Sequence, residues 1–296
     1  MKIILSRKGF DSSAGGCPSP IFPDGSMLAL PIPDRDSQVR YQDLTWQGRN
    51  LGDLVPRLAG GKPRAHYRAH LDPDLIPAMR PRAADWRPVF GQRGPAQGHL
   101  RNNDVGAGDL FLFFGLFRNV TEAGDFIPGA PSRHILWGWL QVAEALPVDD
   151  HRGRLGWAGD HPHLSIVGDP SNTMYVATER LSLSGAEGIP GAGVFGQFAL
   201  TRQLTAPGST GPSTWILPSW FHPEGRRSAL SYHSKVGAWE RCFDGVKLQT
   251  VGRGQEFVLD ASDFPEAITW SRQTITAIFE KNFFAHNPGH CQKKGQ

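Results

Sequence analysis

Val105–Arg118, VGAGDLFLFFGLFR, is the stretch that decides the fold class of this chain. A Gly-Asp turn leads into an apolar run, Leu110–Phe117, in which hydrophobic residues follow one another without alternation. Such a run indicates a strand that is buried on both faces. It is also far shorter than the roughly 20 apolar residues that a membrane-spanning helix needs. We therefore predict a central strand of a buried sheet, and no association with a membrane.

The next apolar stretch, SRHILWGWLQVAEAL at Ser132–Leu146, is typical of a second long strand. Ile135, Trp137 and Trp139 point to one face, and the residues between them point to the other. A polar loop joins the two stretches. We therefore expect an antiparallel pair, with the loop overhanging one end of the sheet.

Glycine and proline constrain the remaining architecture. The 296 residues include 35 Gly and 24 Pro, well above the average combined usage of roughly 12%. This composition favours many turns and short strands, and it argues against a helical bundle. We predict one β-rich α+β domain over 1–296, with further strands that include Lys2–Arg7 and Met27–Pro33. The region Lys62–Asn103 is expected to be mostly irregular.

Two helices are predicted. Asn50–Ala59 places Leu51, Leu54, Val55 and Leu58 on one helical face. The second helix is C-terminal and begins near Asp263, which is followed by proline and glutamate in positions that suit a helix start. The polar tail at 283–296 is expected to be flexible.

A polar loop, SRKGFDSSAGG at Ser6–Gly16, follows the first strand and is called the opening loop below. Its glycine spacing matches neither a Walker loop nor a dinucleotide fingerprint. Backbone amides and hydroxyls in such a loop can nevertheless hold a ligand oxygen, and Asp11 can accept a hydrogen bond from a base. The candidate ligand-binding residues are Ser6, Arg7, Lys8, Gly9, Ser12, Ser13, Gly15 and Gly16. The alternative is a solvated connection between strands.

A second polar segment, AHYRAHLDPDL at Ala65–Leu75, contains His66, His70, Asp72 and Asp74. Alternate residues of an extended segment share a face, so these groups could act together. They could form an acid–base pair or bind a divalent metal ion. Asp72-Pro73-Asp74 is also ordinary turn chemistry.

Two further segments contain histidines. His161 and His163 flank a proline, and LSYH at Leu230–His233 brings Tyr232 next to His233. Aromatic residues near the second segment could stack on a base, although aromatic residues also fill β-rich cores. A G-x-S-x-G nucleophile elbow is absent from the sequence.

Charge and cysteine content bear on partners and location. Residues 35–101 contain twelve Lys or Arg, six Asp and no Glu, a net charge of +6. This bias is typical of a surface that meets phosphates, or of arginines that satisfy carbonyls within loops. Three cysteines form no paired motif, and MKIIL is too short for a secretory signal. A reducing, cytoplasmic location is expected.

Several blocks taken together resemble a known family. SRKGFDSSAGG with PSPIFPDG, HLDPDL, GDLFLFFGLFR, NTMYVA, LSYH and GQEFVLD are similar to the third nucleotide-modification-associated domain family. The resemblance implies a role beside enzymes that modify nucleic-acid bases in bacteria and their phages. Val105–Leu146 also resembles the core of PUA-like barrels, which bind RNA or modified bases. This second resemblance implies a PUA-like barrel core with elaborating loops.

We therefore expect a protein that recognises or processes a nucleotide or a modified base. In this hypothesis Arg7 and Lys8 meet phosphate and Asp11 faces the base edge, with no cofactor required. The candidate catalytic residues are Asp11, His70, Asp72 and His233, and Asp74 and Tyr232 join the ligand-binding set. The segments that carry these residues are expected to line one cleft.

Two other hypotheses remain open. One is a metal-dependent hydrolase or transferase that uses His66, His70, Asp72 and Asp74, with His161 or His163. The other is an adaptor that binds base-modification enzymes.

Overall fold

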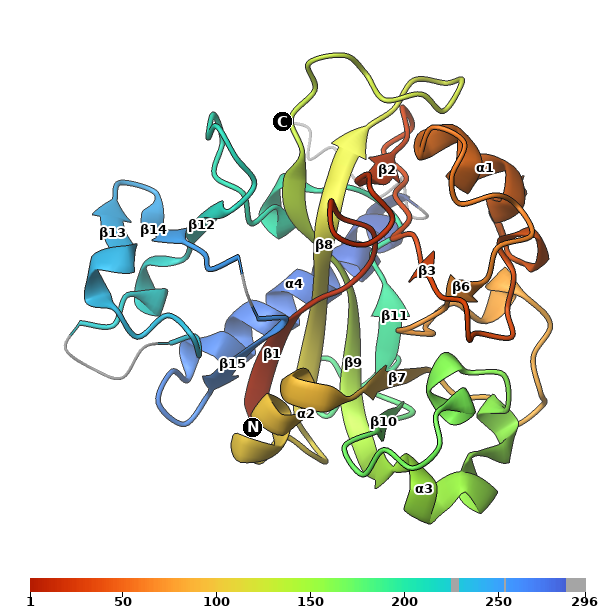
Figure 1. The fold of residues 1–296 in the computed structure, drawn as a ribbon. Helices are drawn as coiled ribbons and strands as arrows, with labels where there is room; N and C mark the ends of the chain where they lie inside the picture. Colours follow the sequence, from red (N-terminus) through yellow and green to blue (C-terminus); the bar gives the residue numbers. More distant parts are fainter. Residues whose placement is uncertain (225–228, 253, 286–296) are drawn as a thin grey trace, which may run out of the picture.

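The computed structural model describes residues 1–224, 229–252 and 254–285 (Figure 1). Its main sheet has the strand order β15-β1-β8-β9-β10-β7, and two short strands pair beside this path, β2 with β8 and β11 with β9. These strands are β15 (Glu256–Asp260), β1 (Lys2–Arg7), β8 (Leu110–Asn119), β9 (Arg133–Pro147), β10 (Thr173–Ala177), β7 (Val89–Gln92), β2 (Ser19–Ile21) and β11 (Ala192–Val194).

The pair predicted from the apolar stretches is the centre of this sheet. β8 and β9 run antiparallel, with Leu112 opposite Trp139. All but one of the residues from Leu110 to Phe117 are buried, as expected for a strand covered on both faces. The central strand pair is therefore confirmed.

The opening loop leaves and rejoins one edge of β8. β1 and β2 both pair with β8 in parallel, β1 at Leu110–Phe114 and β2 at Phe117–Asn119. Between them the chain departs from the sheet at Lys8, whose N–H donates to the Phe114 carbonyl at 2.8 Å. A Cβ atom on Gly115 would lie 2.6 Å from the Lys8 carbonyl oxygen, so glycine makes room for this departure. Beyond Arg7 the opening loop therefore lies outside the sheet, and the chain returns to β8 at β2.

Helices and small sheets surround the main sheet. The long C-terminal helix α4 (Glu266–Ala285) passes behind β8 and β9 in Figure 1. The other helices are α1 (Leu51–Leu58), α2 (Gly94–Asn102) and α3 (Val148–His151). The small sheets are β12 (Thr214–Leu217), β14 (Gly245–Gln249) and β13 (Trp239–Cys242); β3 (Ile32–Pro33) with β6 (Ala69–His70); and β4 (Thr45–Trp46) with β5 (Arg49–Asn50).

The mixed, β-rich architecture with a C-terminal helix agrees with the predicted class. A closed PUA-like barrel is not confirmed, because β15 and β7, the two ends of the sheet path, are not paired with each other among the described strands. A side-chain hydrogen bond joins these two strands: Gln92 Nε2 donates to Glu256 Oε1 at 2.6 Å. This contact lies beside the candidate site.

The expected strand at Met27–Pro33 was largely wrong. Met27–Pro33 contributes only the two-residue strand β3, whereas β2 forms earlier, in a segment rich in proline. The region 62–103 is mostly irregular, as expected, although it also contains β7 and α2. Of the tail at 283–296, residues 283–285 belong to α4, and 286–296 lie outside the described residues. Among the described residues, no helix combines the length and apolar character needed to cross a bilayer.

Candidate functional site

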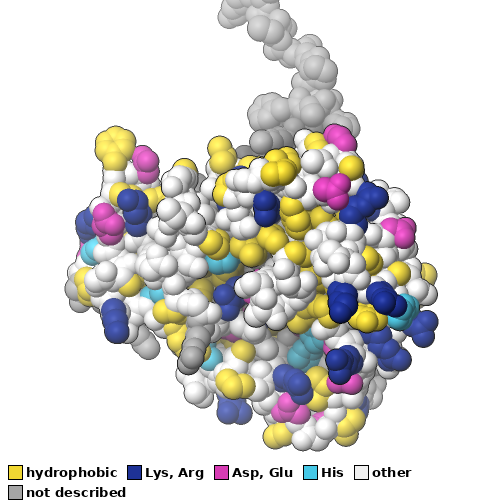
Figure 2. Space-filling model, turned by 45° about the horizontal axis from the view of Figure 1, so that its top comes forward, with side chains coloured by type: hydrophobic (Ala, Val, Ile, Leu, Met, Phe, Trp, Pro, Cys, Tyr) yellow, Lys and Arg dark blue, Asp and Glu magenta, His cyan; other side chains and the backbone are white. Residues whose placement is uncertain are grey.

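A polar cavity of about 210 Å³, the site cavity, opens where β1 and β7 end and β15 begins. The opening loop, the segment after β6 and the loop that carries His163 all contribute to it, although they are far apart in the sequence. In the space-filling view of Figure 2, histidine side chains lie recessed among Lys and Arg side chains. The lining residues are Arg7, Lys8, Gly9, Asp11, Ser13, Ala14, Ile32, His70, Asp72, Gly91, Gln92, Arg93, His163 and Gln255.

Backbone pairing brings the second predicted segment to this cavity. His70 lies in β6 opposite Ile32 of β3, and Asp74 exchanges backbone hydrogen bonds with Val89 of β7. The segment therefore runs alongside β7. The N–H of Gly91 donates to Asp72 Oδ1 at 2.8 Å, which directs the carboxylate toward β7.

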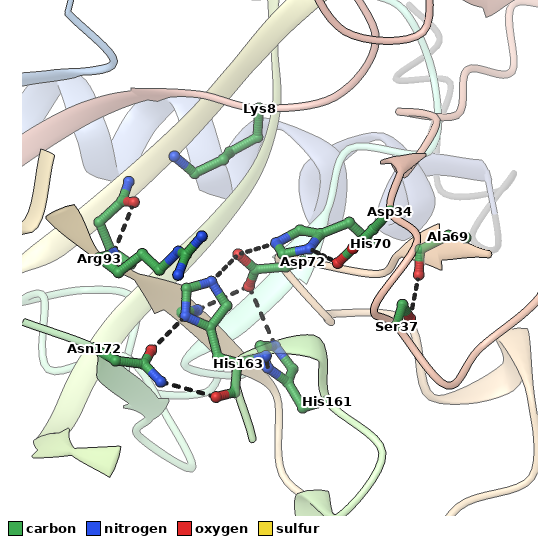
Figure 3. A network of polar contacts seen from close by, with 12 residues as sticks. Lys8, Asp34, Ser37, Ala69, His70, Asp72, Arg93, His161, His163 and Asn172 are labelled. Atoms are coloured by element: carbon green, nitrogen blue, oxygen red, sulfur yellow. Dashed lines mark hydrogen bonds and ion pairs between the residues drawn. The ribbon is translucent and has the colours of Figure 1, made fainter. Parts of the chain in front are cut away.

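Asp72 is buried among three imidazoles, and we call these four residues the Asp72 cluster (Figure 3). Asp72 Oδ2 lies 3.7 Å from His70 Nε2 and 3.6 Å from His163 Nε2. Asp72 Oδ1 lies 3.2 Å from His161 Nε2. The main hypothesis expected His70 and Asp72 to act as a pair, and only the metal-dependent alternative added His161 or His163.

Outer hydrogen bonds fix the two rings that face the cavity. His70 Nδ1 is 2.7 Å from Asp34 Oδ2, and His163 Nδ1 is 2.6 Å from Asn172 Oδ1. Asn172 Nδ2 donates to the His163 carbonyl at 2.8 Å, which fixes the orientation of the amide. Since Nδ1 of each ring is occupied, Nε2 of each ring is directed at Asp72 Oδ2.

Burial and charge separate the pKa values of these groups. Burial raises the pKa of Asp72, but its interactions with His161 and His70 outweigh burial and hold that pKa far below its ordinary range. Burial lowers the pKa of His70, whereas hydrogen bonds to Asp34 and Asp72 raise it to about 9. Burial lowers the pKa of His163 to about 4, against the opposing charge of Asp72. At neutral pH Asp72 is ionised, His70 is charged and His163 is neutral.

Arg93 is a cavity residue that sequence reasoning missed. It follows β7 and precedes the first turn of α2, and 55% of its side chain is exposed. Its closest carboxylate is Asp169, at 3.7 Å. In Figure 3 its guanidinium lies next to His163. The sequence does contain a local signal for its position, because the Gly94-Pro95 pair directly after Arg93 marks a helix start.

The basic residues of the opening loop are already engaged. Lys8 Nζ is 2.7 Å from Glu256 Oε1, and both side chains are largely buried. The Arg7 guanidinium donates to the carbonyls of Gly252 and Gly254 at 3.2 Å. Both residues line the cavity, but their charges also hold the start of β15 in place.

Of the other candidate residues in the opening loop, some line the site cavity and others do not. Asp11 lines the cavity, and its Oδ1 accepts from the N–H and hydroxyl of Ser13 at 2.7 and 2.6 Å, which shapes the loop. Gly9 and Ser13 also line the cavity. Ser6 is buried in the sheet, and Ser12 and Gly16 are exposed elsewhere. Gly15 lines a different cavity.

His66 and Asp74 lie apart from His70 and Asp72. Asp74 forms a two-pronged ion pair with Arg82, with both N–O distances 2.6 Å, and burial raises the pKa of Asp74 against that ion pair. His66 lines an outer cavity of about 630 Å³. That outer cavity is also lined by Gly15, Pro33, Asp34, Arg35, Lys62, Pro63, Tyr67 and Arg68.

The 231–233 segment lies outside the site cavity. Tyr232 is 49% exposed, and its ring centroid lies 4.3 Å from that of His99, with the two rings tilted by 31°. It lines an adjoining cavity of about 520 Å³ that shares Gln92, Arg93 and Gln255 with the site cavity. His233 is buried 4.8 Å from the Phe257 ring and accepts from the Val251 N–H. Its surroundings are those of a packed histidine.

The model of nucleotide modification associated domain 3 matches residues 2–260, which include every residue of the site cavity. The chain belongs to this family. Membership confirms the resemblance of the sequence blocks, and the family name associates the protein with nucleotide modification. No curated protein and no solved structure matches the chain.

Proposed function

We propose that this member of the family binds one nucleotide unit, free or within a nucleic acid, and acts on its base in the site cavity. The observation that carries the proposal is that Arg93 lines the same cavity as three members of the Asp72 cluster, His70, Asp72 and His163. A guanidinium is suited to phosphate, and the cluster is suited to reacting with whatever enters the cavity.

The size of the cavity favours one base or one sugar. Sites for drug-sized ligands measure about 300–1,000 Å³, whereas this cavity measures about 210 Å³. The phosphate would then stay at the opening near Arg93. Asp11, Gln92 and Gln255 line the cavity and offer amide and carboxylate groups that pair with base edges.

The cluster favours processing over recognition alone. Recognition of a base needs hydrogen-bond donors and acceptors, and these need no shifted pKa values. The cluster instead holds an ionised carboxylate in a buried position and drives the pKa values of two neighbouring imidazoles apart. Such arrangements are concentrated at reactive centres.

Binding is tested with nucleoside monophosphates and short oligonucleotides that carry modified or unmodified bases. Arg93→Ala is expected to weaken binding about tenfold, as loss of a charged hydrogen bond would. Arg154→Ala is the matched control, because the Arg154 side chain is 58% exposed and also pairs with a carboxylate. Equal binding by wild type, Arg93→Ala and Arg154→Ala would contradict the phosphate role of Arg93.

Processing is tested separately by mass spectrometry of the bases after incubation with the protein. Asp72→Asn is expected to retain most nucleotide binding and to lose any change in base mass that the wild type produces. If the wild type binds these ligands but changes none of the bases in a panel of modified and unmodified nucleotides, recognition alone is supported.

A further inference from the structure

We infer that His70 Nε2, Asp72 Oδ2 and His163 Nε2 form a binding site for one divalent transition-metal ion. One ligand atom from each of the three residues lies within 4.8 Å of the others, and Asp72 Oδ2 is 3.7 and 3.6 Å from the two Nε2 atoms. The ligand set differs from the one expected from sequence, because His66 and Asp74 are not part of it. The inference rests on the cluster itself and does not require the proposed function.

The ligand atoms converge because each side chain is held from behind. Asp34 occupies Nδ1 of His70, and Asn172 occupies Nδ1 of His163. The Gly91 N–H occupies the other oxygen of Asp72. Such outer partners orient ligands in metal sites and fix the histidine tautomer. Here they direct one atom of each side chain at the same point, and an ion that binds there displaces the proton from His70 Nε2.

The distances suit a small cation. A tetrahedral ion with bonds of about 2.1 Å places its ligand atoms about 3.4 Å apart, and the two N–O distances here are 3.6 and 3.7 Å. Two imidazole nitrogens and one carboxylate favour zinc, iron or a similar ion over magnesium or calcium, which prefer oxygen ligands. Three protein ligands also leave a position for a ligand oxygen from the cavity.

Two further contacts fix the side chains of the cluster. His161 Nε2 is buried 3.2 Å from Asp72 Oδ1, the carboxylate oxygen that the proposed ion does not use. A Cβ atom on Gly91 would lie 2.4 Å from the His163 ring, so only glycine allows the ring to sit against β7. Both contacts hold ligand side chains of the proposed site in place before an ion binds.

The test uses the full-length protein after removal of metal with a chelator. Zn²⁺ and Co²⁺ are titrated, the bound metal is counted by elemental analysis, and the visible spectrum of the Co²⁺ form is recorded. One ion per chain is expected, together with a Co²⁺ band typical of nitrogen and oxygen ligands and no comparable affinity for Mg²⁺. Failure of the wild type to bind one Zn²⁺ or Co²⁺ ion would overturn the inference even if no variant folded.

Variants then locate the ion. His163→Ala is expected to weaken Co²⁺ binding at least 100-fold. Asn172→Ala should weaken it about 10- to 100-fold through the orientation of His163. His66→Ala is the matched control from the segment of His70 and should bind as the wild type does. Equal Kd values for folded His163→Ala and His66→Ala would exclude this site. Nucleotide binding by the metal-free wild type is measured in parallel, so that each proposal can fail without the other.

Discussion

His163 Nε2 lies 3.6 Å from Asp72 Oδ2, although the two residues belong to segments that are distant in the sequence. Asp72 follows β6, and His163 lies in the short 3-10 helix η4 (Pro162–Ser165), between α3 and β10. The contact exists because β7 passes between these segments: Gly91 donates to Asp72, and its missing side chain leaves room for the His163 ring. The geometry of the candidate site therefore depends on a single backbone position of β7.

Gly91→Ala is expected to displace the His163 ring and disrupt the Asp72 cluster. The added methyl group would lie 2.4 Å from that ring, and overpacking of this kind typically costs about 1–3 kcal/mol of stability. We expect a lower urea midpoint together with a loss of Co²⁺ binding. Gly98→Ala in α2, where a Cβ would meet open space, should be neutral or stabilising. Normal Co²⁺ binding by Gly91→Ala would contradict the packing argument.

Lys8→Ala is expected to destabilise the fold more than it affects ligand binding. Lys8 pairs with the buried Glu256, and removal of one partner from a buried ion pair costs about 3–5 kcal/mol. Gln92 also donates to Glu256, so we expect a loss of about 3 kcal/mol. The measurement is the free energy of unfolding in urea, with the more exposed Lys2→Ala as control. An unchanged free energy with lost nucleotide binding would instead identify Lys8 as a phosphate ligand.

Acid is expected to destabilise the protein through His134. Burial lowers the pKa of His134 to about 4, assisted by Arg7 and opposed by Asp11. The ordinary value is about 6.5, so the unfolded chain takes up the proton first as the pH falls. The stabilising contribution is complete above pH 6.5 and is lost as the pH falls toward 4. Between pH 7.5 and pH 5 the loss is about 2 kcal/mol.

The urea midpoints of the wild type and His134→Gln at these two pH values test this assignment. Glutamine can still accept the hydrogen bond that Trp215 Nε1 donates to His134 Nδ1 at 3.0 Å. Other groups titrate in both proteins, so their contributions cancel in the difference. His134→Gln should lose less stability on acidification than the wild type. The same loss in both proteins would rule out His134 as the cause.

The outer cavity provides a test of whether the ligand is a nucleic acid. Arg35 and Lys62 are exposed there, and Asp34 separates them from His70. If a polynucleotide backbone lies along this surface, Arg35→Ala/Lys62→Ala should weaken oligonucleotide binding about tenfold. It should also reduce the slope of log Kd against log salt by about 2. Mononucleotide binding should not change.

The matched control for that experiment is Arg154→Ala/Arg180→Ala, which removes the same charge from exposed positions that do not line the outer cavity. Equal losses in the two double variants would indicate a general effect of net charge. Loss of mononucleotide binding in Arg35→Ala/Lys62→Ala would point to a contact with the nucleotide itself.

The sequence predicted those elements whose formation depends on neighbouring residues in the chain. Continuous apolarity predicted β8, and helical spacing predicted α1. The polar character of the opening loop and of the segment after β6 identified two of the segments that line the cavity. β7 was missed because its four residues lie in a region rich in arginine and proline, where pairing with β10 outweighs weak local preference.

The sequence by itself determined a β-rich sheet centred on one buried strand pair, and the segments in which polar residues gather. Tertiary structure alone decided that His163 and Arg93 join His70 and Asp72, while His66, Asp74 and His233 lie elsewhere. The reason is physical. Periodicity fixes which face of its own element a side chain occupies, whereas the order of strands in the sheet sets the distance between elements.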